Sequence, residues 1–303
     1  MYSSSSSENS KQNKEEEYAE DDNPLIVKRF GELELPQYGL GYEIFQAMKR
    51  NSLRVAQYIA DTNHTETFGE LLENCIRVAI NLKYDQFSAD DAIGLSSINH
   101  QYTCVPYIAA MFLGVKVVAF DTSLSVTDRI YLFQQLAPKV LFVDVDILPS
   151  IEESISKGGF NIKIVVFGED GNGHIIFSDY LVATEEEISN FEPIKLQSNR
   201  DTAAILFSSG TTGMPKGICV SHYGLLSQAL LVILSGDTGD DENPVIMTFT
   251  ELYWISSIDF LMAALVGGIA RVIAANYDPE ELWGHIEKYR VCFCIQLQFT
   301  LFR

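Results

Sequence analysis

Basic residues are scarce in this chain. Its 303 residues include 21 lysines and arginines against 41 aspartates and glutamates, which gives a formal net charge of −20. Proteins that bind nucleic acid present basic patches to the phosphates, and anionic membrane surfaces attract polybasic segments. The charge balance therefore argues against nucleic acid and against anionic membranes as partners.

Long apolar runs and a cysteine framework are also missing. No apolar run reaches the roughly 20 residues that a membrane span needs, and no basic segment followed by an apolar one predicts a signal peptide. The five cysteines are an odd number without framework spacing, which favours a reduced, intracellular compartment. Cys292 and Cys294 alternate within an apolar run, so we expect both to pack in the core on one face of a strand, with no metal site.

The first part of the chain is polar. Residues 1–23 are rich in serine and acidic residues and offer almost nothing to bury, which predicts a disordered tail. From residue 24 the composition is that of a folded protein. Apolar residues at helical spacing predict helices over residues 42–60 and 67–82, the second with Thr65 as a possible cap.

A regular alternation of apolar strands and amphipathic helices follows. We predict strands over residues 92–98, 115–120, 140–143 and 162–167, with helices over 102–112, 126–136 and 148–156. Short, unalternating apolar strands are covered on both faces, so the pattern predicts an α/β fold with a parallel sheet between helical layers. A tight turn into a short strand over 171–176 and an acidic helix over 181–188 complete this part.

A polar stretch with one proline, residues 192–201, is the best linker candidate. We therefore predict a first α/β subdomain over residues 24–195 and part of a second over 196–303. In the second we expect helices over 225–234, 258–266 and 278–289, the last capped by Asp278, and strands over 245–249, 269–274 and 291–297.

The sequence ILFSSGTTGMPKGICVSH, residues 205–222, has the chemistry of an oligophosphate-binding loop. Its glycines permit positive φ and close backbone approach, its turn amides and hydroxyls can donate to an anion, and its lysine supplies a mobile positive charge. The glycine spacing and Pro215 differ from the common mononucleotide loop, so a strand–loop–strand hairpin fits better. The candidate phosphate-binding residues are Ser208, Ser209, Gly210, Thr211, Thr212, Gly213 and Lys216.

Composition alone leaves a flexible polar hairpin tip as an alternative, but the ordered string SSGTTGMPKG is more specific. It resembles the phosphate-binding signature of the adenylate-forming ligases, which include acyl-CoA synthetases, 4-coumarate–CoA ligases and firefly luciferases. The resemblance extends from about residue 40 to the end. It implies ATP-dependent activation of a carboxylic acid as acyl-AMP, then transfer to CoA, with Mg²⁺ held mainly through the ATP phosphates.

The segment LYWISS, residues 252–257, resembles a family pattern in which a histidine lies near the acyl-adenylate and a glycine beside the acyl pocket. Trp254 stands in place of that histidine and Ser257 in place of that glycine. Tyr253, Trp254 and Ser257 are therefore candidates for the wall of an acyl pocket. The alternative is that two large aromatics simply open a core helix. A family proline pair is replaced by Gln296 and Leu297.

The resemblance places further functional elements beyond Arg303: an adenine-binding strand, a ribose-binding aspartate, and a mobile C-terminal lid with a second lysine. We therefore expect an incomplete second subdomain, no lid and an incomplete catalytic set, with Lys216 stabilising phosphate. Three hypotheses stay open: a catalytically incomplete acid–CoA ligase, a non-catalytic nucleotide or acyl binder or partner protein, and an unrelated fold. Relatives are often peroxisomal with a terminal Ser-Lys-Leu; this chain ends Leu-Phe-Arg, which favours the cytoplasm.

Overall fold

The computed structural model describes residues 38–87, 91–208, 215–235, 243–275 and 278–295. The predicted tail, residues 1–23, lies outside the described residues. In chain order the elements are α1 (Leu40–Arg50), β1 (Val55–Ile59), β2 (His64–Thr67), α2 (Phe68–Tyr84), β3 (Ala92–Ser96), α3 (Cys104–Phe112), β4 (Lys116–Ala119), α4 (Val126–Gln135), β5 (Val140–Asp144), η1 (Val145–Ile147), α5 (Leu148–Gly158), β6 (Lys163–Phe167), β7 (Ile175–Ile176), η2 (Phe177–Leu181), α6 (Glu185–Ser189), β8 (Thr202–Phe207), β9 (Gly217–Ser221), α7 (His222–Ser235), β10 (Val245–Thr248), α8 (Ile255–Gly267), β11 (Ala270–Ile273), α9 (Pro279–Tyr289) and β12 (Phe293–Ile295).

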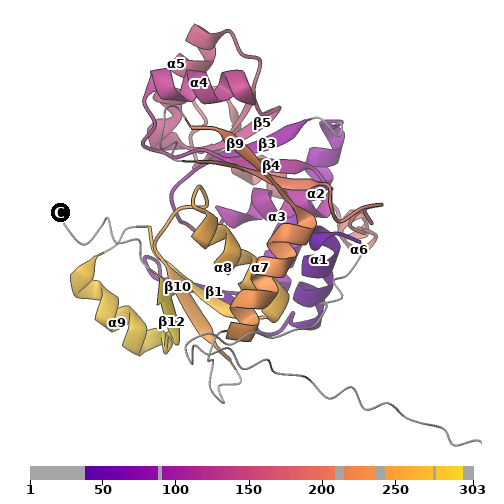
Figure 1. Ribbon diagram of the computed structural model, residues 1–303, viewed down its shortest axis with the longest axis vertical. Coiled ribbons are helices and arrows are strands. Elements are labelled where there is room, and N and C mark those ends of the chain that lie inside the picture. The colour runs from indigo at the N-terminus through magenta and orange to yellow at the C-terminus, as the bar shows by residue number, and fades with distance from the viewer. Residues whose placement is uncertain (1–37, 88–90, 209–214, 236–242, 276–277, 296–303) are drawn as a thin grey trace, which may run out of the picture. The chain divides into compact units, whose positions relative to one another are not determined.

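The larger sheet has seven strands in the order β7-β6-β5-β3-β4-β8-β9. All neighbours are parallel except β8 and β9, which form an antiparallel hairpin. Helices α4 and α5 cover one face (Figure 1), where Leu132, Phe133 and Ile151 pack on strand residues such as Val118 and Leu141. The apolar strands with helical connections predicted this parallel α/β sheet, and the prediction is confirmed.

The smaller sheet has five strands in the order β12-β10-β11-β1-β2. Helix α9 packs on one face through Leu282 and Tyr289. Helices α7 and α8 cover the other face, where Phe260 and Ala264 meet Ile246. Figure 1 shows α1, α3, α7 and α8 in the region between the two sheets, so the helices between the sheets provide a shared apolar layer.

Close contacts join the helices and loops of this middle layer. A Cβ at Gly41 of α1 would overlap the carbonyl oxygen of Met111 in α3, so only glycine permits the approach of these two helices. The Gln57 Nε2 on β1 donates to the carbonyl oxygen of Gln101, after β3, at 2.9 Å. A residue of the smaller sheet is thus tied to a loop of the larger one.

Several predicted helix limits need correction. The helix predicted over 42–60 ends at Arg50, and Val55 and Ile59 belong to strand β1, because pairing with β11 and β2 supplies their backbone hydrogen bonds. The cap of α2 is Thr67, which forms a capping box with Glu70, instead of Thr65. The helix predicted over 181–188 is replaced by η2 and the shorter α6, whose capping box starts at Thr184.

The sheet order does not follow the expected boundary between residues 195 and 196. Strands β8 and β9 lie in the seven-stranded sheet with β3 to β7, whereas β1 and β2 lie in the five-stranded sheet with β10 to β12. The described part of the chain therefore first forms two strands of the smaller sheet, then all seven strands of the larger sheet, and then returns to the smaller one. The order of the strands along the sequence does not show which sheet each strand joins, because strand pairing brings together residues that are far apart in the chain.

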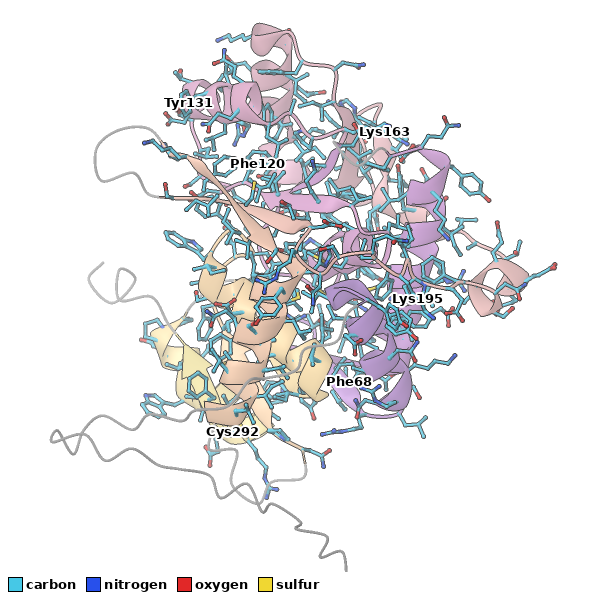
Figure 2. The ribbon with its side chains drawn as sticks, turned by 45° about the vertical axis from the view of Figure 1, so that its right-hand side comes forward. Phe68, Phe120, Tyr131, Lys163, Lys195 and Cys292 are labelled. Carbon is cyan, nitrogen blue, oxygen red and sulfur yellow. The ribbon has the colours of Figure 1, made fainter. Side chains whose placement is uncertain are left out.

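The expectation that Cys292 and Cys294 pack in the core is wrong. Both are exposed, because β12 is an edge strand that pairs only with β10 among the described strands. The Sγ of Cys292 donates to the carbonyl oxygen of Val245 at 3.0 Å. Figure 2 shows Cys292 at the end of the folded part opposite to Phe120, which follows β4 of the larger sheet.

Candidate functional site

The predicted phosphate loop is the connection of the β8–β9 hairpin. Phe207 pairs with Gly217 at the end of the ladder, and the backbone N–H of Ser208 donates to the carbonyl oxygen of Lys216 at 3.0 Å. These contacts confirm the expected strand–loop–strand arrangement. The predicted cradle residues Ser209, Gly210, Thr211, Thr212 and Gly213 lie outside the described residues.

The described ends of this loop are held at the carboxyl edge of the parallel sheet. The side-chain amide of Gln135, the last residue of α4, donates to the carbonyl oxygen of Pro215 at 3.1 Å. Ser208 is half-buried and Lys216 is exposed. Within the described part of the chain, the Lys216 ammonium has no salt bridge, so its charge is available to an anion at this edge.

A half-buried carboxyl group, that of Glu251, links the two sheets beside this edge. The hydroxyl of Thr122, after β4, donates to Glu251 Oε1, after β10, at 2.7 Å. Burial raises the pKa of Glu251, and the Thr122 hydrogen bonds oppose that rise. Sequence reasoning missed this pair. The available signal was that both residues follow a strand of a parallel sheet, where polar side chains from different strands meet.

The three candidates for an acyl wall differ in their surroundings. Tyr253 packs against the core cluster of the larger sheet and meets the Trp254 ring edge-on at 5.4 Å. Trp254 precedes α8 and is 39% exposed. Ser257 is buried, and its hydroxyl donates to the carbonyl oxygen of Thr250 at 2.6 Å.

Ser257 instead lines a small cavity of about 20 Å³ between the sheets, together with Thr250, Cys104 and Arg271. Neither Tyr253 nor Trp254 lines that cavity. The structure thus brings the two aromatic residues together and places Ser257 apart from them. A role for all three in one acyl pocket stays a prediction.

A second polar cluster adjoins the same cavity. The guanidinium of Arg271 donates to Gln57 Oε1 at 2.9 Å and to the Cys104 sulfur at 3.3 Å. Gln57 also donates to Glu66, a buried carboxyl group whose pKa is raised by burial. The sequence signal was a glutamine inside the apolar strand β1, because a fully buried polar side chain needs partners.

Comparison with known proteins assigns the chain to a family. A family model described as AMP-binding enzyme matches residues 44–297. The chain belongs to this family. The match includes the β8–β9 hairpin and both sheets, and it confirms the fold and the ligase relationship that the hairpin sequence implied.

Curated relatives of this family member include CoA ligases. A probable CoA ligase of Humulus lupulus is 26% identical over 89% of this chain and 49% of the relative. A 2-succinylbenzoate–CoA ligase of Bacillus licheniformis is 27% identical over 80% of this chain and 46% of the relative. The chain therefore spans about half the length of the curated relatives that it matches.

A solved structure agrees with this assignment. The luciferase-like enzyme from the nonluminescent mealworm Zophobas morio superposes with a TM-score of 0.78 at 31% identity, covering 86% of this chain and 60% of that one.

Within the described residues, no helix is long and apolar enough to cross a membrane.

Proposed function

We propose that this chain supplies the phosphate-binding part of an AMP-forming acid–thiol ligase. In the proposed reaction a carboxylate oxygen attacks the α-phosphorus of ATP, pyrophosphate leaves, and the thiol of CoA then takes the acyl group from AMP. The observation that carries the proposal is the β8–β9 hairpin, which presents the Ser208–Lys216 segment at the carboxyl edge of a parallel sheet. Membership of the AMP-binding family supports it.

The proposed role of Lys216 is electrostatic. Its exposed ammonium is a compact point charge, suited to the β- or γ-phosphate of ATP. Ser208 and the hydroxyls and amides of residues 209–213 are proposed to complete the cradle. Stabilisation of the leaving pyrophosphate is the chemistry expected of such a group, because adenylation depends on positioning and on charge neutralisation.

Mg²⁺ is proposed to enter with the nucleotide. Among the described residues no group of three His, Cys, Asp or Glu side chains is arranged to hold a metal ion. Mg²⁺ is commonly bound through substrate phosphates and water together with one or two carboxylates. The phosphates of ATP are therefore proposed as the main ligands of the Mg²⁺ ion.

Two relatives point to the proposed ligands. A solved structure of MatB from Rhodopseudomonas palustris, with a TM-score of 0.71 at 20% identity, is described as ATP-bound. An anthranilate–CoA ligase, with a TM-score of 0.75 at 22% identity, is described in complex with anthranoyl-AMP. At these identities the likeness establishes the fold alone, and binding of ATP or an acyl-adenylate by this chain remains our proposal.

A non-catalytic nucleotide or acyl binder is the second candidate. It is favoured by Trp254, which stands where the resembling ligases have a histidine and is 39% exposed at the start of α8. The two candidates share ATP binding and differ in turnover.

The test is calorimetric titration with ATP and with pyrophosphate, followed by an assay with ATP, CoA and a panel of aromatic and fatty acids. For the 303-residue chain we expect binding of both phosphates and no acyl-CoA. Absence of phosphate binding would reject the ligase candidate and would leave only acyl binding for the non-catalytic one. Acyl-CoA formation within about tenfold of an intact relative would reject the non-catalytic candidate and the expected incompleteness.

A further inference from the structure

A second cavity lies at the carboxyl edge of the seven-stranded sheet, away from the β8–β9 hairpin. It has a volume of about 500 Å³ and is formed by the segments that follow β3, β5 and β6, with η2 as a further wall. Ile98, His100, Asp144 and Glu169 are among its lining residues. We call it the switch-point pocket.

The sheet topology explains why a cavity forms at this position. Strands β3 and β5 are neighbours, but the chain leaves β3 toward β4 on one side and leaves β5 toward β6 on the other. The loops after these two strands therefore diverge and leave a crevice between them. In open α/β sheets, such a crevice at the carboxyl ends of the strands is the usual place for a ligand.

The floor of the pocket is a fixed hydrogen-bond network. Asp144 accepts from the Ser97 hydroxyl at 2.8 Å and from the backbone N–H of Ile98 at 2.7 Å. His100 Nδ1 accepts from the backbone N–H of Tyr102 at 3.1 Å. The proton of the neutral ring therefore lies on Nε2, which is 3.3 Å from Asp144 Oδ1. The network orients both side chains without a ligand.

Aromatic rings form one wall. Phe167 meets the His100 ring edge-on at 4.6 Å and packs against Phe177 at 4.8 Å. Phe177 also packs against Tyr102 at 5.2 Å. All four residues line the pocket. The wall can therefore receive an apolar or aromatic body, and its ring faces favour a nearby cation.

The polar groups of the pocket carry negative charge. Asp144, Asp146 and Glu169 are lining residues, and none of the lining residues, all of which are described, is lysine or arginine. Asp146 and Glu169 are exposed and have no ion pair within the described residues. No metal-binding trio is present in the same described part of the chain, so a divalent ion fits less well than an organic cation.

We propose that the switch-point pocket binds a small organic cation with an aromatic or alkyl body, of the arylalkylammonium class. The body packs on the aromatic wall formed by Phe167, Phe177 and Tyr102, and the ammonium faces the carboxylates of Asp146 and Glu169. In the sheet order, strands β3 and β4 separate β5 from β8, so this site is distinct from the phosphate hairpin and does not depend on the proposed ligase function.

The test uses three probes of one shape on the full chain: 2-phenylethylammonium, neutral 2-phenylethanol and anionic 3-phenylpropionate, each measured by titration calorimetry. We expect the ammonium to bind most tightly and the anion most weakly. Equal affinity for the ammonium and the alcohol, tighter binding of the anion, or no binding of the ammonium would each overturn the proposal.

Variants locate the site. The double variant Asp146→Asn with Glu169→Gln is expected to weaken ammonium binding by about five- to twentyfold, since each exposed ion pair contributes up to about 1 kcal/mol. Glu192→Gln, an exposed carboxylate outside the pocket, is the matched control and should leave the affinity unchanged. Equal affinities for the double variant and the wild type would overturn the assignment.

A third variant tests the cavity itself. Ser178 is exposed and lines the pocket, so Ser178→Trp adds bulk at its mouth without disturbing a buried contact. We expect loss of 2-phenylethylammonium binding with an unchanged melting temperature, and unchanged ammonium binding would overturn the location. Lys216→Ala should retain ammonium binding, and its loss in that variant would show that the two sites are one.

Discussion

Two regions share the carboxyl edge of the seven-stranded sheet and have opposite charge. The connection of the β8–β9 hairpin carries the exposed, positively charged side chain of Lys216. The switch-point pocket instead combines aromatic rings with the carboxylates of Asp144, Asp146 and Glu169. One sheet can therefore offer an anion site and a cation site, because each strand end contributes its own loop. The sheet fixes where a ligand can bind, and the loop residues decide its charge.

The two regions also differ in how their residues are distributed along the chain. The hairpin site is contiguous, within residues 208–216, while the pocket joins segments that follow three different strands and η2. A contiguous site keeps its spacing in the sequence, so a motif can identify it. A site assembled by topology becomes visible only when the strand order is known.

The largest effect is expected from breaking the floor of the pocket. Asp144→Ala removes the acceptor for the Ser97 hydroxyl, the Ile98 N–H and His100. The Ser97 hydroxyl and His100 Nε2 keep their mutual contact at 3.0 Å, whereas the Ile98 N–H loses its carboxylate partner. Hydrogen bonds to a charged group contribute roughly 1.5–3 kcal/mol, so we expect the free energy of unfolding to fall by about 3 kcal/mol. Urea denaturation measures this loss.

Asp146→Ala is the matched control for that experiment. Asp146 lies two residues further along, is exposed and makes no ion pair within the described part of the chain. Exposed substitutions of this kind change stability by about 0.5 kcal/mol or less. Equal losses in the two variants would contradict the view that a preorganised network supports the pocket.

The next effect concerns the hairpin. Lys216→Ala is expected to weaken pyrophosphate binding by about tenfold to a hundredfold, because one charge-assisted contact contributes roughly 1.5–3 kcal/mol. Stability should hardly change, since the lysine is exposed. Lys216→Arg should restore binding only in part, because a planar fork replaces a compact charge. Titration calorimetry with pyrophosphate on the three proteins decides this.

Salt dependence provides a control for the lysine effect. Higher ionic strength should weaken pyrophosphate binding more in the wild type than in Lys216→Ala, because an exposed charge is screened. Indistinguishable heats for the two proteins would leave the hairpin as a polar turn. Retained binding of 2-phenylethylammonium in Lys216→Ala would at the same time separate the two regions.

The sequence predicted the repeated part of the fold well. Apolar strands such as β5 and β6 alternate with helices such as α4 and α5, and this pattern has few solutions besides a covered parallel sheet. It predicted the hairpin because SSGTTGMPKG fixes glycines, hydroxyls and a lysine at set spacings. It also predicted Asp278 as the cap of α9, which the Asp278 carboxylate confirms by accepting from the Glu280 N–H at 2.8 Å.

The errors occurred where distant contacts decide the structure. Val55 and Ile59 have helical spacing relative to α1, but pairing with β11 and β2 makes them a strand. The alternation around Cys292 and Cys294 suggested a buried strand, but an edge position leaves it exposed. The pocket floor escaped prediction for the same reason, because Ser97 and Asp144 meet only through the pairing of β3 with β5.

The last and smallest effect contrasts two partly buried carboxyl groups, one with donors and one without. Asp144 has several donors, whereas Asp259 Oδ1 on α8 is buried without a hydrogen-bond partner among the described residues. Burial raises the pKa of Asp259 from the ordinary 3.8 to about 6. The folded state therefore binds the proton more tightly than the unfolded state, and this group lowers stability as pH rises from about 4 to about 6.

Asp259→Asn removes that titration while keeping the side-chain size. We expect the variant and the wild type to have similar unfolding free energies at pH 4, where the wild-type carboxyl is mostly protonated in the folded state. At pH 7.5 the variant should be more stable by about 1 kcal/mol, after allowance for partial solvent screening. Urea denaturation of both proteins at the two pH values isolates the titration of Asp259, because every other titrating group is common to both proteins.

A stability difference between the two proteins that is the same at pH 4 and pH 7.5 would contradict a raised pKa of Asp259. It would also remove the contrast between a carboxylate whose charge is stabilised by donors and one whose charge is disfavoured by burial.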